Sequence, residues 1–69
     1  MSKEEMIAYL ENIGIVVHEE SWGQFDLIDE KDPNFPSRLE PPSGEQVWTG
    51  GGGWTKKEMR KLVEGLKSK

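Results

Sequence analysis

Carboxylates are the most concentrated groups in this sequence that could do chemistry. Six of them fall within residues 19–32, namely Glu19, Glu20, Asp26, Asp29, Glu30 and Asp32. Several carboxylates can bind a hard cation, and a pair can transfer protons during hydrolysis. The spacing lacks the central glycine and terminal glutamate of an EF-hand, and 69 residues leave little room for a substrate cleft. We interpret these residues as a solvated acidic surface, without a metal, a cofactor or a catalytic residue.

Composition excludes most thiolate and imidazole chemistry. The chain has no cysteine and a single histidine, His18. It therefore has no disulfide framework and no thiolate zinc site. One histidine cannot build a His-rich metal site or activate a cysteine nucleophile that the chain lacks. We expect a protein that is not an enzyme.

A run of four glycines, residues 50–53, precedes a lysine-rich segment and raises the question of phosphate binding. Backbone N–H groups at a helix N-terminus attract anions, and Lys56 and Lys57 would add positive charge. Thr55, however, occupies the position where a P-loop needs glycine and a dinucleotide fingerprint needs glycine or alanine. We favour a hinge that lets Trp48 and Trp54 reach the core.

Charge is distributed unevenly along the chain, whose net charge is −4. Residues 1–45 hold three basic and eleven acidic side chains, whereas residues 46–69 hold six basic and two acidic ones. Four basic side chains could contact the phosphates of a nucleic acid: Lys56, Lys57, Arg60 and Lys61. The net negative charge argues against a general nucleic-acid binder, so this function is the alternative.

Trp22 is the best candidate for an interaction anchor. It falls between two predicted strands, and tryptophan is enriched at binding hot spots. Acidic neighbours would steer a basic partner toward it, which gives a predicted partner-binding set of Trp22, Glu19, Glu20, Asp26 and Asp29. The leading hypothesis is a small acidic regulator, adaptor or inhibitor that binds a larger protein. A homodimer stays open, as does burial of Trp22 beneath residues 30–46.

Two helices are predicted, over residues 3–13 and 56–67. Each begins with a capping box, in which a hydroxyl residue and a glutamate three positions later bond each other's backbone N–H. Apolar residues recur at helical spacing in both helices, namely Met6, Ile7, Leu10 and Ile13, then Met59, Leu62, Val63 and Leu66. Gly14 is suited to end the first helix, and Gly65 either ends the second or permits a close contact.

A β-hairpin is predicted over residues 15–29. β-branched residues favour a strand at 15–20, and Phe25 and Leu27 share one face of a second strand at 24–29. A turn centred on Trp22 and Gly23 would place Glu19 opposite Asp26. Because that pair is like-charged and unfavourable, a bulge or a longer loop is the alternative.

An irregular segment is predicted over residues 30–53, with a short third strand as an option at 46–49. All four prolines lie in this segment and exclude a helix. Phe35 and Leu39 are expected to pin it to the core. Pro33, Pro36 and Arg38 also fit the minimal ligand pattern of SH3 domains, but we favour a proline-stiffened connection as their explanation.

The fold class that follows is a small α+β single domain, residues 1–69, in the order helix, hairpin, irregular segment, helix. Both helices should pack on one face of the sheet, and the other face would be covered by residues 30–46, a second copy or a partner. The N-terminus lacks an apolar signal segment, and the longest apolar run, residues 15–17, is too short to cross a membrane. We expect a cytoplasmic protein without a membrane partner.

Overall fold

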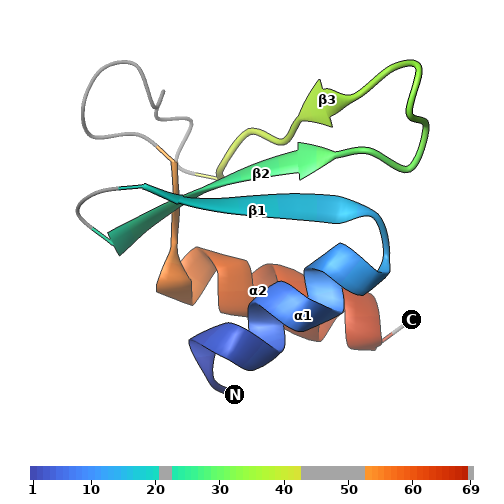
Figure 1. Ribbon diagram of the computed structural model, residues 1–69. Helices are drawn as coiled ribbons and strands as arrows, with labels where there is room; N and C mark the ends of the chain where they lie inside the picture. The colour runs from blue at the N-terminus through green and yellow to red at the C-terminus, as the bar shows by residue number, and fades with distance from the viewer. Residues whose placement is uncertain (21–22, 43–52, 69) are drawn as a thin grey trace.

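The structure is a computed structural model that describes residues 1–20, 23–42 and 53–68. In chain order its elements are α1 (Lys3–Asn12), β1 (Ile15–Glu20), β2 (Gln24–Asp29), β3 (Ser37–Arg38), β4 (Trp54–Thr55) and α2 (Lys56–Lys67). Both helices lie against one side of the sheet (Figure 1), so the predicted α+β class is confirmed. The optional strand at 46–49 and the predicted anchor Trp22 lie outside the described residues.

Helix α1 begins at a capping box, as the sequence predicts. The Glu5 N–H donates to Ser2 Oγ at 3.2 Å, and the Ser2 N–H donates to Glu5 Oε1 at 3.2 Å. Hydrogen bonds from the Ser2 backbone and then from its side chain lower the pKa of the Glu5 carboxyl below its ordinary value. The helix ends at Asn12, one residue before the predicted end.

Gly14 turns the chain from α1 into β1. Its φ of +94° lies in the left-handed region that favours glycine. A Cβ atom at this position would lie 2.8 Å from Lys31 Cγ. The glycine therefore allows both the turn and the close approach of the segment that follows β2.

Strand β2 is the centre of a four-stranded antiparallel sheet. It pairs with β1 along one edge and with the short strands β3 and β4 along the other. The register is shifted by one position from the register that a two-residue turn would give. Glu19 lies opposite Phe25 and not opposite Asp26. Residues 21–23 connect the strands, and Gly23 has a φ of +70°, as is common at the end of three-residue hairpin loops. The longer loop thus avoids the like-charged pair.

Two short strands complete the sheet. Strand β3 lies within the segment predicted to be irregular and pairs with the end of β2. Strand β4 pairs with the start of β2, where Trp54 lies opposite Phe25. Neither strand was predicted, because two residues are too few to show the alternation that indicates a strand.

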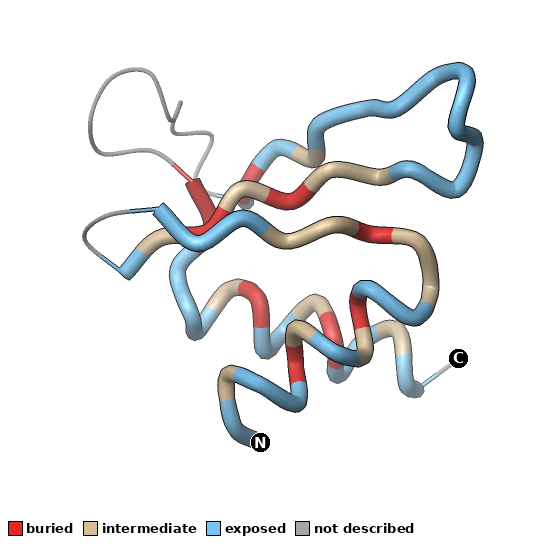
Figure 2. Tube along the Cα trace, viewed as in Figure 1, coloured by how far each residue is buried: buried red, intermediate tan, exposed pale blue. Residues whose placement is uncertain are grey.

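The core lies between the sheet and the two helices (Figure 2). Eight hydrophobic side chains are at most 6% exposed: Met6, Leu10, Ile15, Phe25, Leu27, Trp54, Met59 and Val63. The apolar faces predicted for both helices are thereby confirmed, and the remaining members of each face are half-buried against the core. Among the described residues, neither helix is long and apolar enough to pass through a lipid bilayer.

Trp54 connects three parts of the fold. Its ring is buried, and its backbone pairs opposite Phe25 in β4. Its Nε1–H donates to the Leu39 carbonyl oxygen at 3.1 Å, and the Leu39 N–H donates to the Leu27 carbonyl oxygen at 2.9 Å. Trp54 therefore reaches the core, as predicted, and fastens the segment that follows β3.

Helix α2 begins with the second predicted capping box. The Glu58 N–H donates to Thr55 Oγ1 at 3.1 Å, and the Thr55 N–H donates to Glu58 Oε1 at 3.0 Å. The helix extends to Lys67, with Gly65 exposed in its interior. A Cβ atom at Gly65 would meet no described neighbour within 4 Å, so this glycine neither ends the helix nor permits a close contact.

Gly65→Ala is expected to stabilise the protein by about 0.5–1 kcal/mol, because alanine loses less backbone entropy than glycine in a helix. Urea denaturation should show a higher midpoint with an unchanged slope. The matched control is Gly14→Ala, which should destabilise because the positive φ and the approach of Lys31 both oppose a side chain. A lower midpoint for Gly65→Ala would contradict the helical, unobstructed position of this residue.

Trp54→Phe is expected to lower the free energy of unfolding by about 1–3 kcal/mol. Phenylalanine keeps an aromatic ring in the core but leaves the Leu39 carbonyl oxygen without its indole donor. The measurement is again the urea midpoint. Tyr9→Phe, which also removes a polar hydrogen from an aromatic ring but at a half-buried helix position, should shift the midpoint less. Equal shifts in the two variants would show that the indole hydrogen bond is not what holds Leu39.

Candidate protein-binding surface

The four acidic residues predicted to bind a partner are divided between the two faces of the sheet. Residues opposite each other in adjacent strands share a face, and neighbours along a strand point to opposite faces. Because Phe25 is buried against the helices, Glu19 and Asp29 belong to the helix side. Glu20 and Asp26 belong to the other side. The structure therefore does not gather these four carboxylates into one cluster.

Two of the carboxylates form ion pairs with cations from other elements. Glu19 Oε1 lies 3.2 Å from Nζ of Lys3 at the start of α1. Asp26 Oδ1 accepts a hydrogen bond from Nε of Arg38 in β3 at 2.7 Å. Surface pairs of this kind contribute at most about 1 kcal/mol. Their main effect is to hold α1 against the end of β1, and β3 against β2.

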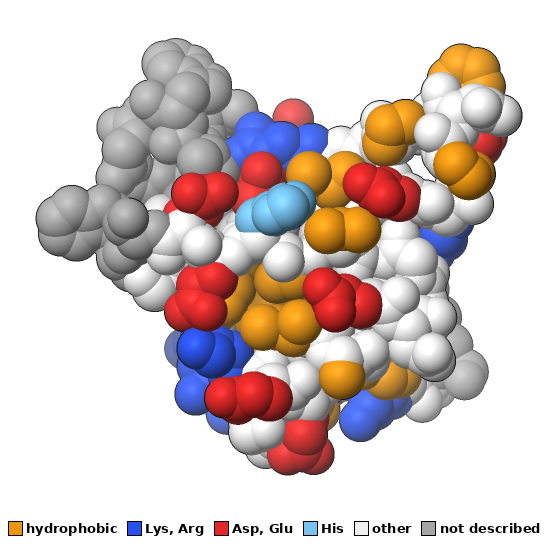
Figure 3. Space-filling model, in the orientation of Figure 1, with side chains coloured by type: hydrophobic (Ala, Val, Ile, Leu, Met, Phe, Trp, Pro, Cys, Tyr) orange, Lys and Arg blue, Asp and Glu red, His pale blue; other side chains and the backbone are white. Residues whose placement is uncertain are grey.

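The sheet face away from the helices is mixed in character. It presents Val16, His18, Glu20, Asp26, Ile28 and Arg38. Val16 and Ile28 lie opposite each other and are half-buried, whereas His18 is exposed and lies opposite Asp26. In the view of Figure 3, both acidic and hydrophobic groups lie close to the histidine. This composition is typical of a sheet face in contact with solvent.

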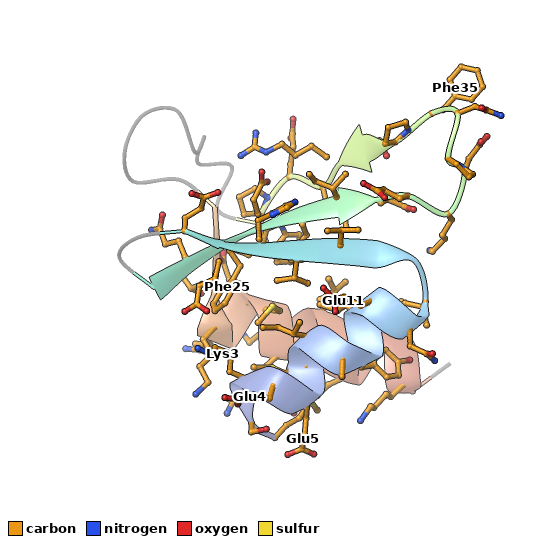
Figure 4. All side chains as sticks on the ribbon, viewed as in Figure 1. Lys3, Glu4, Glu5, Glu11, Phe25 and Phe35 are labelled. Carbon is orange, nitrogen blue, oxygen red and sulfur yellow. The ribbon has the colours of Figure 1, made fainter. Side chains whose placement is uncertain are left out.

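Phe35 is the most exposed large hydrophobic side chain among the described residues. Its exposed fraction is 77%, and its ring points away from the body of the molecule at the tip of the loop between β2 and β3 (Figure 4). The expectation that Phe35 pins this segment to the core is therefore wrong. Leu39 does contact the core, where it is half-buried.

Hydrogen bonds to the backbone hold the loop that carries Phe35. The Lys31 N–H donates to Asp29 Oδ1 at 3.0 Å. The Asn34 N–H donates to Asp32 Oδ1 at 3.0 Å, and the Phe35 N–H donates to the Asp32 carbonyl oxygen at 3.0 Å. A proline on each side of the asparagine–phenylalanine pair also restricts φ. The loop therefore presents the ring in a restricted set of conformations.

The same loop bears on the SH3-ligand interpretation, which needs an extended polyproline conformation. The hydrogen bond between Phe35 and Asp32 closes a turn there instead, and Arg38 is paired with Asp26.

Phe35 was not among the residues predicted to bind a partner. The signal that could have identified it is the run of turn-forming residues, 32–34, directly before it.

Basic side chains gather at the start of α2. Lys56, Lys57 and Arg60 line an open hollow of about 370 Å³ together with Met1. Lys61, the fourth member of the predicted nucleic-acid site, is not part of this lining. The positive end of the helix dipole adds to the positive potential of the three side chains.

No group of three or more His, Cys, Asp or Glu side chains is placed to hold a metal ion in the described ranges 1–20, 23–42 and 53–68. Compared with protein-family models, with curated proteins and with solved structures, the chain matches none of them. The function is therefore inferred from the surfaces of the molecule itself.

Proposed function

We propose that this protein is a non-enzymatic interaction module that binds a larger protein, as a small acidic regulator, adaptor or inhibitor in the cytoplasm. The observation that carries the proposal is the exposure of Phe35 on a loop held by hydrogen bonds. Moving a phenylalanine side chain from water into an apolar pocket is worth about 1.5–3 kcal/mol. A partner with such a pocket would gain this free energy on binding.

The hydrogen bonds within the loop support the same proposal. Binding normally costs about 0.5–1.5 kcal/mol for each flexible side chain that becomes ordered, and more when a loop must also be ordered. The turn from Asp32 to Phe35 is already closed by hydrogen bonds in the unbound chain. More of the free energy of burying the ring is then available for affinity.

Acidic charge would select among partners that have a suitable pocket. Residues 1–45 contain eleven acidic and three basic side chains, so the field of this region accelerates encounters with a basic surface. Trp22, which precedes β2 in the sequence and lies outside the described residues, remains a predicted second anchor. The acidic residues of the sheet, Glu19, Glu20, Asp26 and Asp29, remain predicted contacts on its two faces.

Phe35→Ala is expected to weaken the captured partner's binding about thirtyfold, which corresponds to about 2 kcal/mol for a hot-spot aromatic. Tagged wild-type protein would first be used to capture and identify the partner from cell extract. The dissociation constants of the wild type and the variant for that purified partner would then be compared.

Two controls accompany this comparison. The free energy of unfolding of Phe35→Ala should stay within about 0.5 kcal/mol of the wild type, because the ring is exposed to solvent. Glu64→Ala, an exposed change on α2, should leave the dissociation constant unchanged. Wild-type affinity in Phe35→Ala would remove the basis of the proposal.

Nucleic-acid binding is a second candidate, favoured by the gathering of Lys56, Lys57 and Arg60 around one hollow. Fluorescence anisotropy with labelled duplex DNA and an RNA hairpin would test it. Binding should weaken steeply with salt, because phosphate contacts release counterions. The double variant Lys57→Glu with Arg60→Glu, which reverses two charges that line the hollow, should abolish binding, whereas Lys31→Glu on the β2–β3 loop should have a smaller effect. Absence of wild-type binding at low salt would reject this candidate.

A further inference from the structure

Strand β1 is an edge strand. It pairs with β2 on one side, and no segment among the described residues pairs with its other side. An exposed edge carries a row of unpaired N–H and C=O groups and can therefore accept a further strand. The register between β1 and β2 shows which residues of β1 have backbone groups free to bond such a strand.

One hydrogen bond next to the ladder determines which backbone groups of β1 point outward. The Glu30 N–H donates to the Gly14 carbonyl oxygen at 2.7 Å, just before the first pair, Ile15 and Asp29. Bonded and non-bonded positions alternate along an antiparallel pair. Even-numbered residues of β1 therefore face β2 with their amide groups. The amide groups of the odd-numbered residues, Ile15, Val17 and Glu19, point away from β2 toward the open edge.

Helix α1 borders this edge and brings further acidic charge to it. The ion pair between Lys3 and Glu19 places the start of the helix beside the end of the strand. Glu4 and Glu11 lie on α1 below β1 in the view of Figure 4. We define the β1 edge surface by the outward strand residues, the half-buried Ile7 and four exposed carboxylates, those of Glu4, Glu11, Glu19 and Glu20.

We infer that the β1 edge surface binds an extended basic segment of a protein partner as an added strand, an inference that rests on the proposed function of protein binding. Backbone hydrogen bonds from the outward groups of β1 would give affinity. Among the described residues, Glu19 is the one member of the four that forms an ion pair, with Lys3. Lysine or arginine side chains on the added strand would therefore meet carboxylates that are not already paired.

Charge also distinguishes this occupant from a second copy of the chain. Pairing β1 with β1 of another molecule would bring two such edge surfaces together, each with four exposed carboxylates. Like charges placed across adjoining strands are unfavourable. A basic segment would be attracted to the carboxylates of the edge surface, whereas a second copy would bring further carboxylates next to them.

The test uses the full-length protein and a seven-residue peptide of alternating lysine and valine with blocked ends. The matched control peptide replaces each lysine with glutamate. At saturating lysine peptide, we expect amide hydrogen exchange to slow about tenfold or more at Ile15, Val17 and Glu19, because these groups would enter a new ladder. The glutamate peptide should leave the exchange rates unchanged, and added salt should weaken binding of the lysine peptide.

Two variants of Val17 separate the backbone from the side chain. Val17→Pro removes an N–H that does not bond to β2, and proline is tolerated at such a position of an edge strand. It should weaken the lysine peptide about tenfold or more, whereas Val17→Ala keeps the N–H and should bind almost normally. If Val17→Pro fails to fold, the exchange pattern of the wild type decides alone.

The outcomes separate this inference from the proposed function. Phe35→Ala should bind the lysine peptide like the wild type, because its ring lies on the separate β2–β3 loop. The edge inference is overturned if the lysine peptide does not bind, if it protects amides other than these, or if it binds no better than the glutamate peptide. None of these results would contradict the binding of a protein partner through Phe35. Self-association that protects β1 without peptide would assign the edge to a second copy. Edge binding together with unchanged capture by Phe35→Ala would overturn the proposed anchor alone.

Discussion

Burial of Trp54 is the constraint on which the rest of the structure depends. A chain of this size has few large side chains with which to form a core. Trp54 is one of them, and its ring also carries an N–H group that can donate a hydrogen bond. Its backbone closes the sheet against Phe25, and Thr55 beside it caps α2. The indole N–H reaches the Leu39 carbonyl oxygen. One residue thus joins the central strand, the last helix and the proline-rich segment, and the β2–β3 loop is anchored at its far end as a result.

Most of the fold could be predicted because its signals are local. The capping boxes at Ser2 and Thr55 and the apolar spacing after them define both helices within a few residues of sequence. The β-branched run after Gly14 likewise indicates β1. The hairpin register could not be fixed in this way, because it depends on the length of the loop, and the like-charged pair indicated only that the simplest turn was unfavourable. Strands β3 and β4 owe their existence to pairing with β2, which two residues cannot reveal alone.

The binding surface was harder to predict for a related reason. Whether Glu19 and Glu20 share a face is decided by strand alternation, and their neighbours on each face are decided by the register. Exposure of Phe35 depends on whether its loop folds back on the sheet, which composition does not specify. The turn-forming residues 32–34 are typical of a tight loop, but they do not specify the direction in which the loop points. The sequence therefore identified the kinds of residue that matter, and the three-dimensional pairing decided which of them meet.

The acidic border of β1 has a consequence for how the protein behaves in concentrated solution. The run Ile15, Val16 and Val17 has the apolar, β-branched character of segments that stack into fibrils when they are open to one another. Charged residues beside such a run act as gatekeepers against aggregation. Glu19 and Glu20 follow this run directly in β1, and both are exposed. Negative charge beside the apolar run thus opposes the stacking of one open edge on another, which is the first step toward a fibril.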